Sequence, residues 1–149
     1  MTGRRDAEAS MTPDDLVEIE LIRRLKHRYV RLMDTKQWDA WRELFTADFR
    51  GLYRGPHPDI SYASREEFVA SNREILEPLV TVHHGHMPEI TLTGADSATG
   101  IWAMYDRVEM PGNRFEGYGH YHDEYRRVDG EWRIAAITLT RLRIAPLGD

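Results

Sequence analysis

Residues 100–108 read Gly-Ile-Trp-Ala-Met-Tyr-Asp-Arg-Val, and this stretch decides which kind of fold the second half of the chain adopts. Side chains alternate between the two faces of a strand, so Trp102 and Met104 share one face with Asp106 in an extended chain. Apolar side chains at every second position are typical of a strand with one buried face. The stretch therefore predicts a strand whose buried face carries a carboxylate.

Three further stretches of the second half have the same character. The four predicted strands cover 80–93, 98–110, 115–128 and 131–144. Turn sequences separate them, and the last, Asp129-Gly130, is of the type favoured in two-residue hairpins. We therefore expect an antiparallel meander.

The first half of the chain starts with a helical pattern. Apolar residues recur at spacings of three and four from Pro13 onward, which predicts an amphipathic helix of about five turns that begins after Thr12. The predicted inward face consists of Leu16, Ile19, Ile22, Leu25, Tyr29 and Leu32. Spacings of three and four residues are typical of a helix and not of a strand, so the first predicted element is a helix.

Two shorter helices are predicted next. The second helix ends near Asp48 and carries on one side Trp38, Trp41, Leu44 and Phe45. A short strand over 49–53 and a surface loop over 54–62 follow. The third helix begins at Ser64, forms a capping box with Glu67, and stops at Pro78. Its predicted inward residues are Phe68, Ile75 and Leu76.

Helices followed by a curved antiparallel sheet indicate an α+β fold in which three N-terminal helices cover one face of the sheet. The space between the two layers is a natural place for a pocket. A chain of 149 residues suits one core. We therefore expect one domain over residues 13–149, preceded by a flexible N-terminal tail over residues 1–12, which are small and polar.

The composition argues against several classes of protein. A net charge of −5 gives no electrostatic reason to bind nucleic acid, and the absence of cysteine excludes disulfides and thiolate sites. No apolar run approaches the roughly 18 residues of a membrane span, and the polar start lacks the apolar segment of a signal peptide. We therefore expect a cytoplasmic protein without nucleic-acid or membrane partners.

A second charge ends the apolar face of the last predicted strand, where Ala135, Ile137 and Leu139 are followed by Arg141. Burying one charge alone costs roughly several kcal/mol, whereas burying two opposite charges in good geometry lowers that cost. We therefore expect an Asp106–Arg141 pair inside the pocket. A purely structural ion pair, or a different strand parity, is the alternative.

Tyr29 and Asp34 are polar residues near the end of the first helix that could reach the same pocket. They lie five residues apart, so in a continuous helix their directions differ by about 140° and they converge only if Asp34 is at or beyond the helix end. In the alternative interpretation, Tyr29 is an ordinary core tyrosine and Asp34 caps the second helix.

A histidine-rich segment, His-His-Gly-His, covers residues 83–86. Histidine is the usual general base near neutral pH, and a carboxylate such as Asp34 would orient it. Simple alternation groups His84 and His86, rather than His83, with the apolar positions that follow. A bulge at Gly85 or Pro88 would reset that alternation, so the pattern alone does not select one histidine. Surface histidines on a sheet are the alternative.

A metal site is a competing prediction. His84 with His86, and His120 with His122, form pairs one residue apart on strands that could be neighbours, and imidazole is a common zinc ligand. Such pairs are common on exposed strand faces, and no nearby carboxylate has ligand-like spacing. We therefore predict that no metal is bound.

The order of elements and the segments 29–41, 83–92 and 121–134 resemble the SnoaL-like domains of the nuclear transport factor 2-like superfamily, which have a cone-shaped α+β fold. The resemblance covers about residues 15–144. Within that superfamily the chain is most similar to bile acid 7α-dehydratase, and more distantly similar to scytalone dehydratase and hexachlorocyclohexane dehydrochlorinase.

The resemblance to bile acid 7α-dehydratase implies five site residues. Its tyrosine and aspartate, which precede a Lys-x-Trp-Asp run, match Tyr29 and Asp34, and its His-x-Gly-His-x-Pro-Glu-Ile run places the catalytic histidine at His83. Its remaining aspartate and arginine match Asp106 and Arg141. All five polar positions are therefore present in this chain.

The other two relatives depart from this pattern. The second histidine of scytalone dehydratase aligns with Val108, and the arginine of the dehydrochlorinase aligns with Ile137. These differences argue against the substrates of those two enzymes.

The resemblance implies a dehydratase, or hydro-lyase, that needs no cofactor and acts on a hydroxylated keto steroid or polyketide-like substrate, a hydrophobic small molecule. His83, oriented by Asp34, would move the proton, Tyr29 would hydrogen-bond the substrate oxygen, and Asp106 with Arg141 would position a polar substituent. An isomerase or polyketide cyclase of the same fold, or a non-catalytic module that binds small molecules, are the alternatives. Because relatives are often trimers or dimers, we also expect a homo-oligomer.

Overall fold

The computed structural model describes residues 10–148, so most of the tail predicted over 1–12 lies outside the described residues. The helices come first and the strands follow. The helices are α2 (Pro13–Asp34), α3 (Trp38–Arg42) and α4 (Arg65–Leu76). The strands are β1 (Phe45–Arg54), β2 (Ile60–Tyr62), β3 (Val80–Gly94), β4 (Ser97–Met110), β5 (Asn113–Val128) and β6 (Glu131–Pro146).

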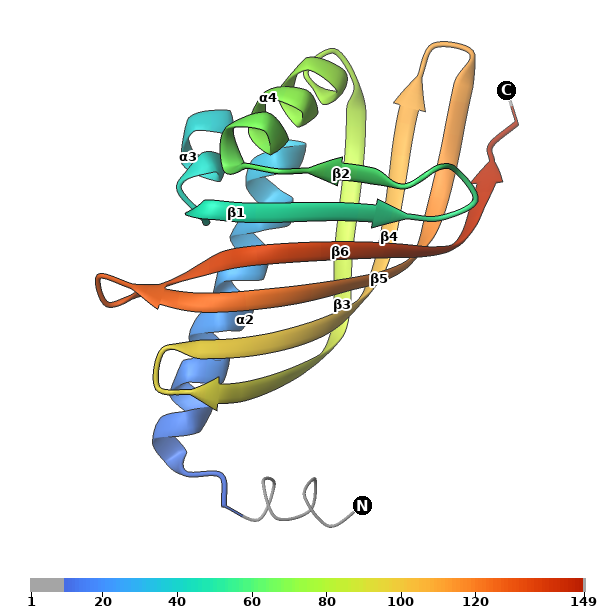
Figure 1. Cartoon of the computed structure of the whole chain (residues 1–149). Helices are drawn as coiled ribbons and strands as arrows, with labels where there is room; N and C mark the ends of the chain where they lie inside the picture. Colours follow the sequence, from blue (N-terminus) through green and yellow to red (C-terminus); the bar gives the residue numbers. More distant parts are fainter. Residues whose placement is uncertain (1–9, 149) are drawn as a thin grey trace.

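The strands form one six-stranded sheet in the order β2-β1-β6-β5-β4-β3. The antiparallel meander of β3 to β6 is confirmed. The expectation of a purely antiparallel sheet is wrong in one place, because β1 pairs with β6 in parallel. This pairing satisfies the backbone groups that β6 would otherwise expose as an edge strand. Figure 1 shows α2 running along one face of the curved sheet, with α3 and α4 together beside β1 and β2.

Helix α2 begins as the sequence predicts. The Thr12 hydroxyl accepts a hydrogen bond from the Asp15 amide, and the Asp15 carboxylate accepts one from the Thr12 amide, which completes a capping box. Of the predicted inward face, four residues are buried: Ile22, Leu25, Tyr29 and Leu32. Leu16 is exposed, because the first turns of α2 extend beyond the sheet (Figure 1). The helix brings its carboxyl end, Asp34, against the sheet.

The predicted boundaries around β1 are wrong. The second helix ends at Arg42 rather than near Asp48, and Phe45 already belongs to β1, where it is the Cα partner of Ile134. The Ile134 amide also donates a hydrogen bond to the Leu44 carbonyl over 2.8 Å. Pairing with β6 therefore overrides the helical pattern, because tertiary hydrogen bonds outweigh weak local propensity.

Two further details near α4 differ from the expectation. The predicted loop over 54–62 contains the short strand β2, whose Tyr62 is the Cα partner of Gly51 in β1. In α4, Phe68 is buried as expected, but Ile75 is exposed and Asn72 lies inward instead. The Asn72 side-chain amide donates to the Phe68 carbonyl over 2.8 Å, which compensates for its burial.

The core lies between the sheet and the helices and is largely aromatic near α3 and α4. Trp41 stacks on Phe68 at a centroid distance of 5.2 Å, and Phe45 packs edge-on against both rings. These rings close one end of the layer arrangement. Among the described residues, no helix is long and apolar enough to cross a membrane.

Candidate active site

The carboxyl end of α2 meets the start of β3 at Asp34 and His83. The Asp34 Oδ1 atom lies 2.6 Å from His83 Nδ1, and Oδ2 accepts a hydrogen bond from the His83 backbone amide over 2.8 Å. Because a carboxylate only accepts, His83 Nδ1 carries the hydrogen and Nε2 is left as the proton-accepting nitrogen. The aspartate therefore fixes both the position and the tautomer of the imidazole, whose side chain is 8% exposed.

The structure also shows why simple alternation does not identify His83. His83 lies on the buried face of β3, while His84 and His86 lie on the exposed face. The pairing of β3 with β4 shifts register between His86 and Glu89, and Met87 has a φ of 46°. The predicted bulge is therefore present, and it returns the apolar side chains that follow to the core side of the strand.

Asp106 is the Cα partner of His83 on the neighbouring strand, so both side chains share the inner face of the sheet. Asp106 Oδ1 and Oδ2 accept hydrogen bonds from Arg141 Nη1 and Nη2 over 2.9 and 2.7 Å, which is bidentate geometry. His83 Nε2 lies 4.0 Å from Asp106 Oδ2. The expected Asp106–Arg141 pair is thus formed, and it lies directly beside the free nitrogen of the histidine.

The electrostatics of Arg141 follow from this pair. Burial opposes the charged form of the guanidinium, but the hydrogen bonds and the negative charge of Asp106 outweigh it and raise the pKa of Arg141. The arginine side chain is 12% exposed and that of Asp106 is 4% exposed. The pair therefore keeps both charges in a site that is almost closed to solvent.

Two glycines of β5, which the sequence interpretation missed, allow close approaches beside the site: Gly117 makes room for the ion pair, and Gly119 makes room for the backbone of β6. A Cβ atom at Gly117 would lie 2.0 Å from Arg141 Nη1 and 2.1 Å from Asp106 Oδ1. A Cβ atom at Gly119 would lie 1.9 Å from the Thr140 carbonyl, where the β5–β6 register shifts. The available signal was glycine inside a long strand, which often marks a bulge or a close approach.

Tyr29 lies in the core rather than against His83. Its ring packs against the rings of Trp41, Phe45 and Tyr121. Burial raises the pKa of Tyr29 well above its ordinary value, and neighbouring Tyr53, which shares a hydrogen bond with it, adds to the shift. The structure therefore brings together four of the five predicted residues and places Tyr29 behind them.

A second buried charge pair lies on the same face of the sheet. Lys26 Nζ is 2.8 Å from Asp123 Oδ2, and the two side chains are 1% and 0% exposed. The ammonium lies over the rings of Tyr29 and Tyr121, at 4.2 and 3.8 Å from their centroids. Burial lowers the pKa of Lys26, and the Asp123 carboxylate acts in the opposite direction. The Tyr125 hydroxyl donates to Asp123 Oδ2 over 2.7 Å.

The four outer histidines do not form the compact cluster that a metal site requires. The two pairs lie on β3 and β5, so the expectation that their strands are neighbours is wrong: β4 separates them, and Ala103 is the Cα partner of both His86 and His120. Within residues 10–148, no group of three or more histidine, aspartate or glutamate side chains is arranged to hold a metal ion.

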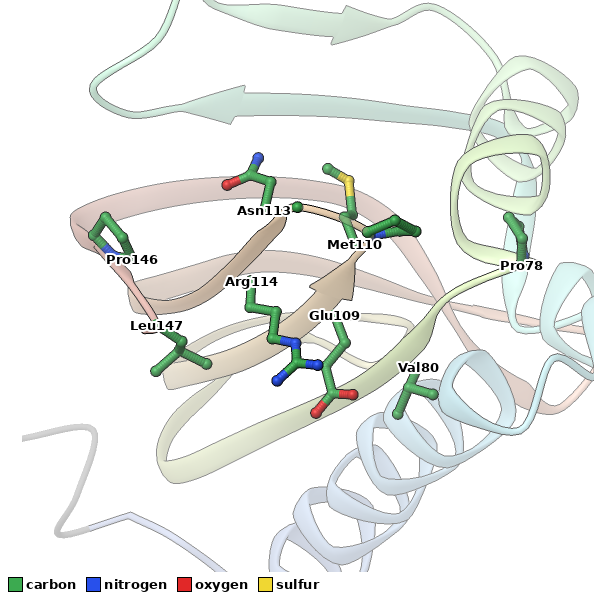
Figure 2. Close-up of a pocket in the computed structure, with 10 residues that line it drawn as sticks. Pro78, Val80, Glu109, Met110, Asn113, Arg114, Pro146 and Leu147 are labelled. Carbon is green, nitrogen blue, oxygen red and sulfur yellow. The ribbon is translucent and has the colours of Figure 1, made fainter. Parts of the chain in front are cut away.

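A surface pocket of about 380 Å³ lies beside the turn between β4 and β5 (Figure 2). Its lining includes Val80, Glu109 and Arg114, and Figure 2 shows the last two side chains projecting to the same side of the hairpin. None of the five predicted site residues lines this pocket. It is therefore separate from the His83 site.

The fold is similar to those of several solved structures. A proposed scytalone dehydratase from Novosphingobium aromaticivorans superposes with a TM-score of 0.82, is 22% identical, and is matched over 93% of each chain. A hexachlorocyclohexane dehydrochlorinase from Novosphingobium barchaimii superposes with a TM-score of 0.76, is 18% identical, and is matched over 91% of this chain and 93% of its own. At these identities the likeness shows the fold alone.

Sequence comparison leads to the family. A proposed cyclase from Gibberella zeae is 24% identical over 134 residues, which are 82% of this chain and 89% of the relative. The family model of the SnoaL-like domain matches residues 14–138. That range covers α3, α4, all of α2 except Pro13, and most of the six-stranded sheet. Since the match spans most of the sequence, the chain belongs to the SnoaL-like domain family.

Proposed function

We propose that this protein is a hydro-lyase that eliminates water from a hydroxylated ketone without a cofactor. The observation that carries the proposal is the way His83 is held and what its second ring nitrogen faces. Its Nδ1 is held by Asp34 at 2.6 Å, and its Nε2 faces the Asp106–Arg141 pair at 4.0 Å. Proton abstraction next to a carbonyl needs an oriented base and a charged group that stabilises the developing negative charge, and this site offers both.

In the proposed reaction, His83 Nε2 takes the proton from the carbon next to the substrate carbonyl. The electrons of the C–H bond form the new double bond, and the C–O bond breaks as the hydroxyl leaves. The imidazolium then returns its proton to the departing hydroxide, so the products are an unsaturated ketone and water. Asp34 stabilises the imidazolium, as a buried carboxylate does for a catalytic histidine.

Asp106 and Arg141 act as a positioning pair in this proposal. Arg141 offers a cationic donor surface to a substrate oxygen, while the bidentate contact with Asp106 prevents the guanidinium from swinging away. Tyr29 supports the site from behind through Tyr53, which shares a hydrogen bond with it and feels the charge of Arg141. We therefore assign Tyr29 an indirect role instead of direct contact with the substrate oxygen.

The family context supports an elimination or a related proton transfer. The relatives include a proposed scytalone dehydratase and a dehydrochlorinase, which are named for eliminations, and a proposed cyclase. The resemblance to bile acid 7α-dehydratase supports a keto steroid or polyketide-like substrate. That closeness, the single domain over 13–149, the homo-oligomeric state and the cytoplasmic location stay predictions from the sequence.

The proposal is tested with a panel of β-hydroxy ketones of steroid and polyketide type. Formation of the conjugated ketone is followed by ultraviolet absorbance, and loss of one water is followed by mass spectrometry. His83→Ala and Asp34→Asn should each reduce kcat by at least about 10²-fold. His84→Ala on the outer face is the matched control and should retain activity. Near-normal turnover by the His83→Ala variant would contradict the assignment of the base.

The two alternatives give different results in the same assay. An isomerase or cyclase would convert the substrate without losing water, while still exchanging the proton next to the carbonyl with deuterated solvent. A binding module would shift the melting temperature with ligand but neither convert it nor exchange its protons. The His83–Asp34 geometry favours proton transfer over binding alone, because binding does not require a fixed tautomer.

A further inference from the structure

We propose that Lys36 and Thr81 are positioning residues that hold Asp34 in place as the carboxylate partner of His83. The inference rests on the proposed function, since it extends the machinery of the same site. Neither residue touches the imidazole. Both act through Asp34.

The contacts form one continuous chain. Lys36 Nζ donates a hydrogen bond to Thr81 Oγ1 over 2.8 Å, and the Thr81 hydroxyl donates to Asp34 Oδ1 over 3.0 Å. Asp34 Oδ1 is the same oxygen that meets His83 Nδ1, while Oδ2 meets the His83 amide. Three hydrogen bonds from β3 therefore fix the plane of one carboxylate, and Thr81 is itself buried.

Thr81 and His83 are two residues apart on β3 and share its inner face. One strand thus supplies the base, its backbone amide and the hydroxyl that orients the partner of the base. The orientation of the Thr81 hydroxyl is fixed, because its oxygen accepts a hydrogen bond from the Lys36 ammonium and its hydrogen then points at Asp34 Oδ1. The ammonium of Lys36 therefore decides which way the Thr81 hydroxyl points.

Lys36 has an unfavourable backbone conformation. Its φ is 61°, in the left-handed region that glycine and asparagine adopt at much lower cost than lysine. Strain of this kind persists where the surrounding structure or the function requires the side chain. The turn after α2 would be easier to form with glycine, which fits a role for the lysine side chain in this place.

The charge surroundings of Lys36 fit this role. Partial burial lowers the pKa of Lys36, while the carboxylates of Asp34 and Glu77 oppose that shift and favour the cation. Both carboxylates thus favour the charged form of Lys36, which donates to Thr81 Oγ1. Without the ammonium, the Thr81 hydroxyl would lose the partner that fixes its direction, and Asp34 would lose an oriented third donor.

The experiment compares matched variants at both positions. Thr81→Val keeps the shape but removes the hydroxyl, and Thr81→Ser restores the hydroxyl. Lys36→Met keeps the stem but removes the charge, and Lys36→Gly removes both the charge and the backbone strain. We expect Thr81→Val and Lys36→Met to lower kcat by about 10- to 10²-fold with little change in KM, because the base is misplaced while the binding surface is intact. Thr81→Ser should recover most of the loss.

Lys36→Gly separates positioning from simple structural support. Because glycine adopts a positive φ freely, this variant should melt at or above the temperature of the natural protein while kcat falls as in Lys36→Met. A purely structural lysine would make stability and activity fall together. Parallel loss of melting temperature and kcat in Lys36→Gly would therefore overturn the inference.

A second readout needs no substrate. The ¹⁵N chemical shifts of the His83 ring, assigned with the His83→Asn variant, distinguish the Nδ1-protonated from the Nε2-protonated tautomer. We expect the Nδ1-protonated form in the natural protein and in Thr81→Ser, and a mixture in Thr81→Val and Lys36→Met. Unchanged ring signals in Thr81→Val would overturn the positioning role. If the signals change as expected but the natural protein converts no ketone, the proposed reaction fails while the positioning of Asp34 stands.

Discussion

The two buried charge pairs on the inner face of the sheet look alike but differ in what surrounds them. Asp106 and Arg141 meet through two hydrogen bonds and lie beside His83. Lys26 and Asp123 are more deeply buried, and their neighbours are tyrosine rings. Lys26 Nζ lacks well-directed hydrogen bonds, and Asp123 Oδ1 has no hydrogen-bond partner among the described residues. Burial of charge therefore does not by itself mark a catalytic site.

What separates the pairs is their exposure to solvent. The Arg141 side chain is 12% exposed, whereas Lys26 and Asp123 have almost no exposure. Solvent therefore reaches the first pair. The second is closed in by its surroundings and serves to fix α2 against β5, because Lys26 comes from the helix and Asp123 from the strand.

The largest expected effect is on stability at the closed pair. Lys26→Met leaves the Asp123 carboxylate buried without a cation and should lower the free energy of unfolding by about 3–5 kcal/mol. Arg141→Met should cost less, because the Arg141 side chain is 12% exposed and water can enter the vacated space beside Asp106. Urea titration of both variants checks the order. Equal losses would mean that water gives Asp106 no support.

Replacement of both members of a pair by apolar residues should lower activity at the Asp106–Arg141 pair but not at the Lys26–Asp123 pair. Asp106→Leu with Arg141→Met should lower kcat/KM by about 10²-fold or more, since the positioning cation is gone. Lys26→Met with Asp123→Leu should keep activity within a few-fold and recover most of the stability lost in Lys26→Met. Comparison of turnover in the two double variants is the measurement. A similar loss in both would show that the closed pair also serves the reaction.

Gly117→Ala tests the geometry of the open pair alone. The new methyl group would collide with Arg141 Nη1 and Asp106 Oδ1, so we expect a loss of about 1–3 kcal/mol in stability and reduced turnover. Gly85→Ala is the matched strand variant, because its Cβ would be 3.3 Å from the nearest atom of Trp102 and should be better tolerated. Thermal melts of the two variants, recorded together, decide the point; an unperturbed Gly117→Ala would show that the pair has room to move.

Alkaline pH should produce the smallest loss of stability per group. It should act mainly on the buried tyrosines around Lys26 and Asp123. Burial raises the pKa values of Tyr29, Tyr121 and Tyr125 well above 10 in the folded protein. Above about pH 10 the unfolded chain releases these protons while the folded protein keeps them, so stability present below pH 10 is lost as the pH rises. Each tyrosine contributes about 1.4 kcal/mol per pH unit. Tyr125→Phe should make the slope of unfolding free energy against pH less steep; an unchanged slope would exclude this residue.

The meander and one of the two ion pairs could be predicted from the sequence because each leaves a local signature. The four strands were placed within about two residues by alternation and by turns such as Asp129-Gly130. Asp106 is a charge on an apolar face. The second pair, which the sequence analysis does not predict, has the same local signal: Asp123 lies between Tyr121 and Tyr125, and Lys26 lies four residues after Ile22.

The start of β1 could not be predicted, because its residues suit two structures. Trp41, Leu44 and Phe45 have helical spacing, yet Leu44 and Phe45 pair with Ile134, which lies about 90 residues further along the chain. A local pattern has no information on such a distant partner. For the same reason the sequence around Gly117 does not indicate its close approach to Arg141, which lies on another strand.

Apolar periodicity predicts most of the buried faces, and the cost of burying a charge predicts that Asp106 and Arg141 need partners, because both are local properties of the chain. Which groups meet depends on tertiary contacts. These contacts point His83 inward instead of His84, bring the Thr81 hydroxyl to the Asp34 carboxylate that binds His83, and place Tyr29 behind the site. These outcomes depend on a bulge, a helix end and a strand register. Such features bring together segments that are distant in the sequence, so the local pattern does not predict hydrogen-bond contacts between them.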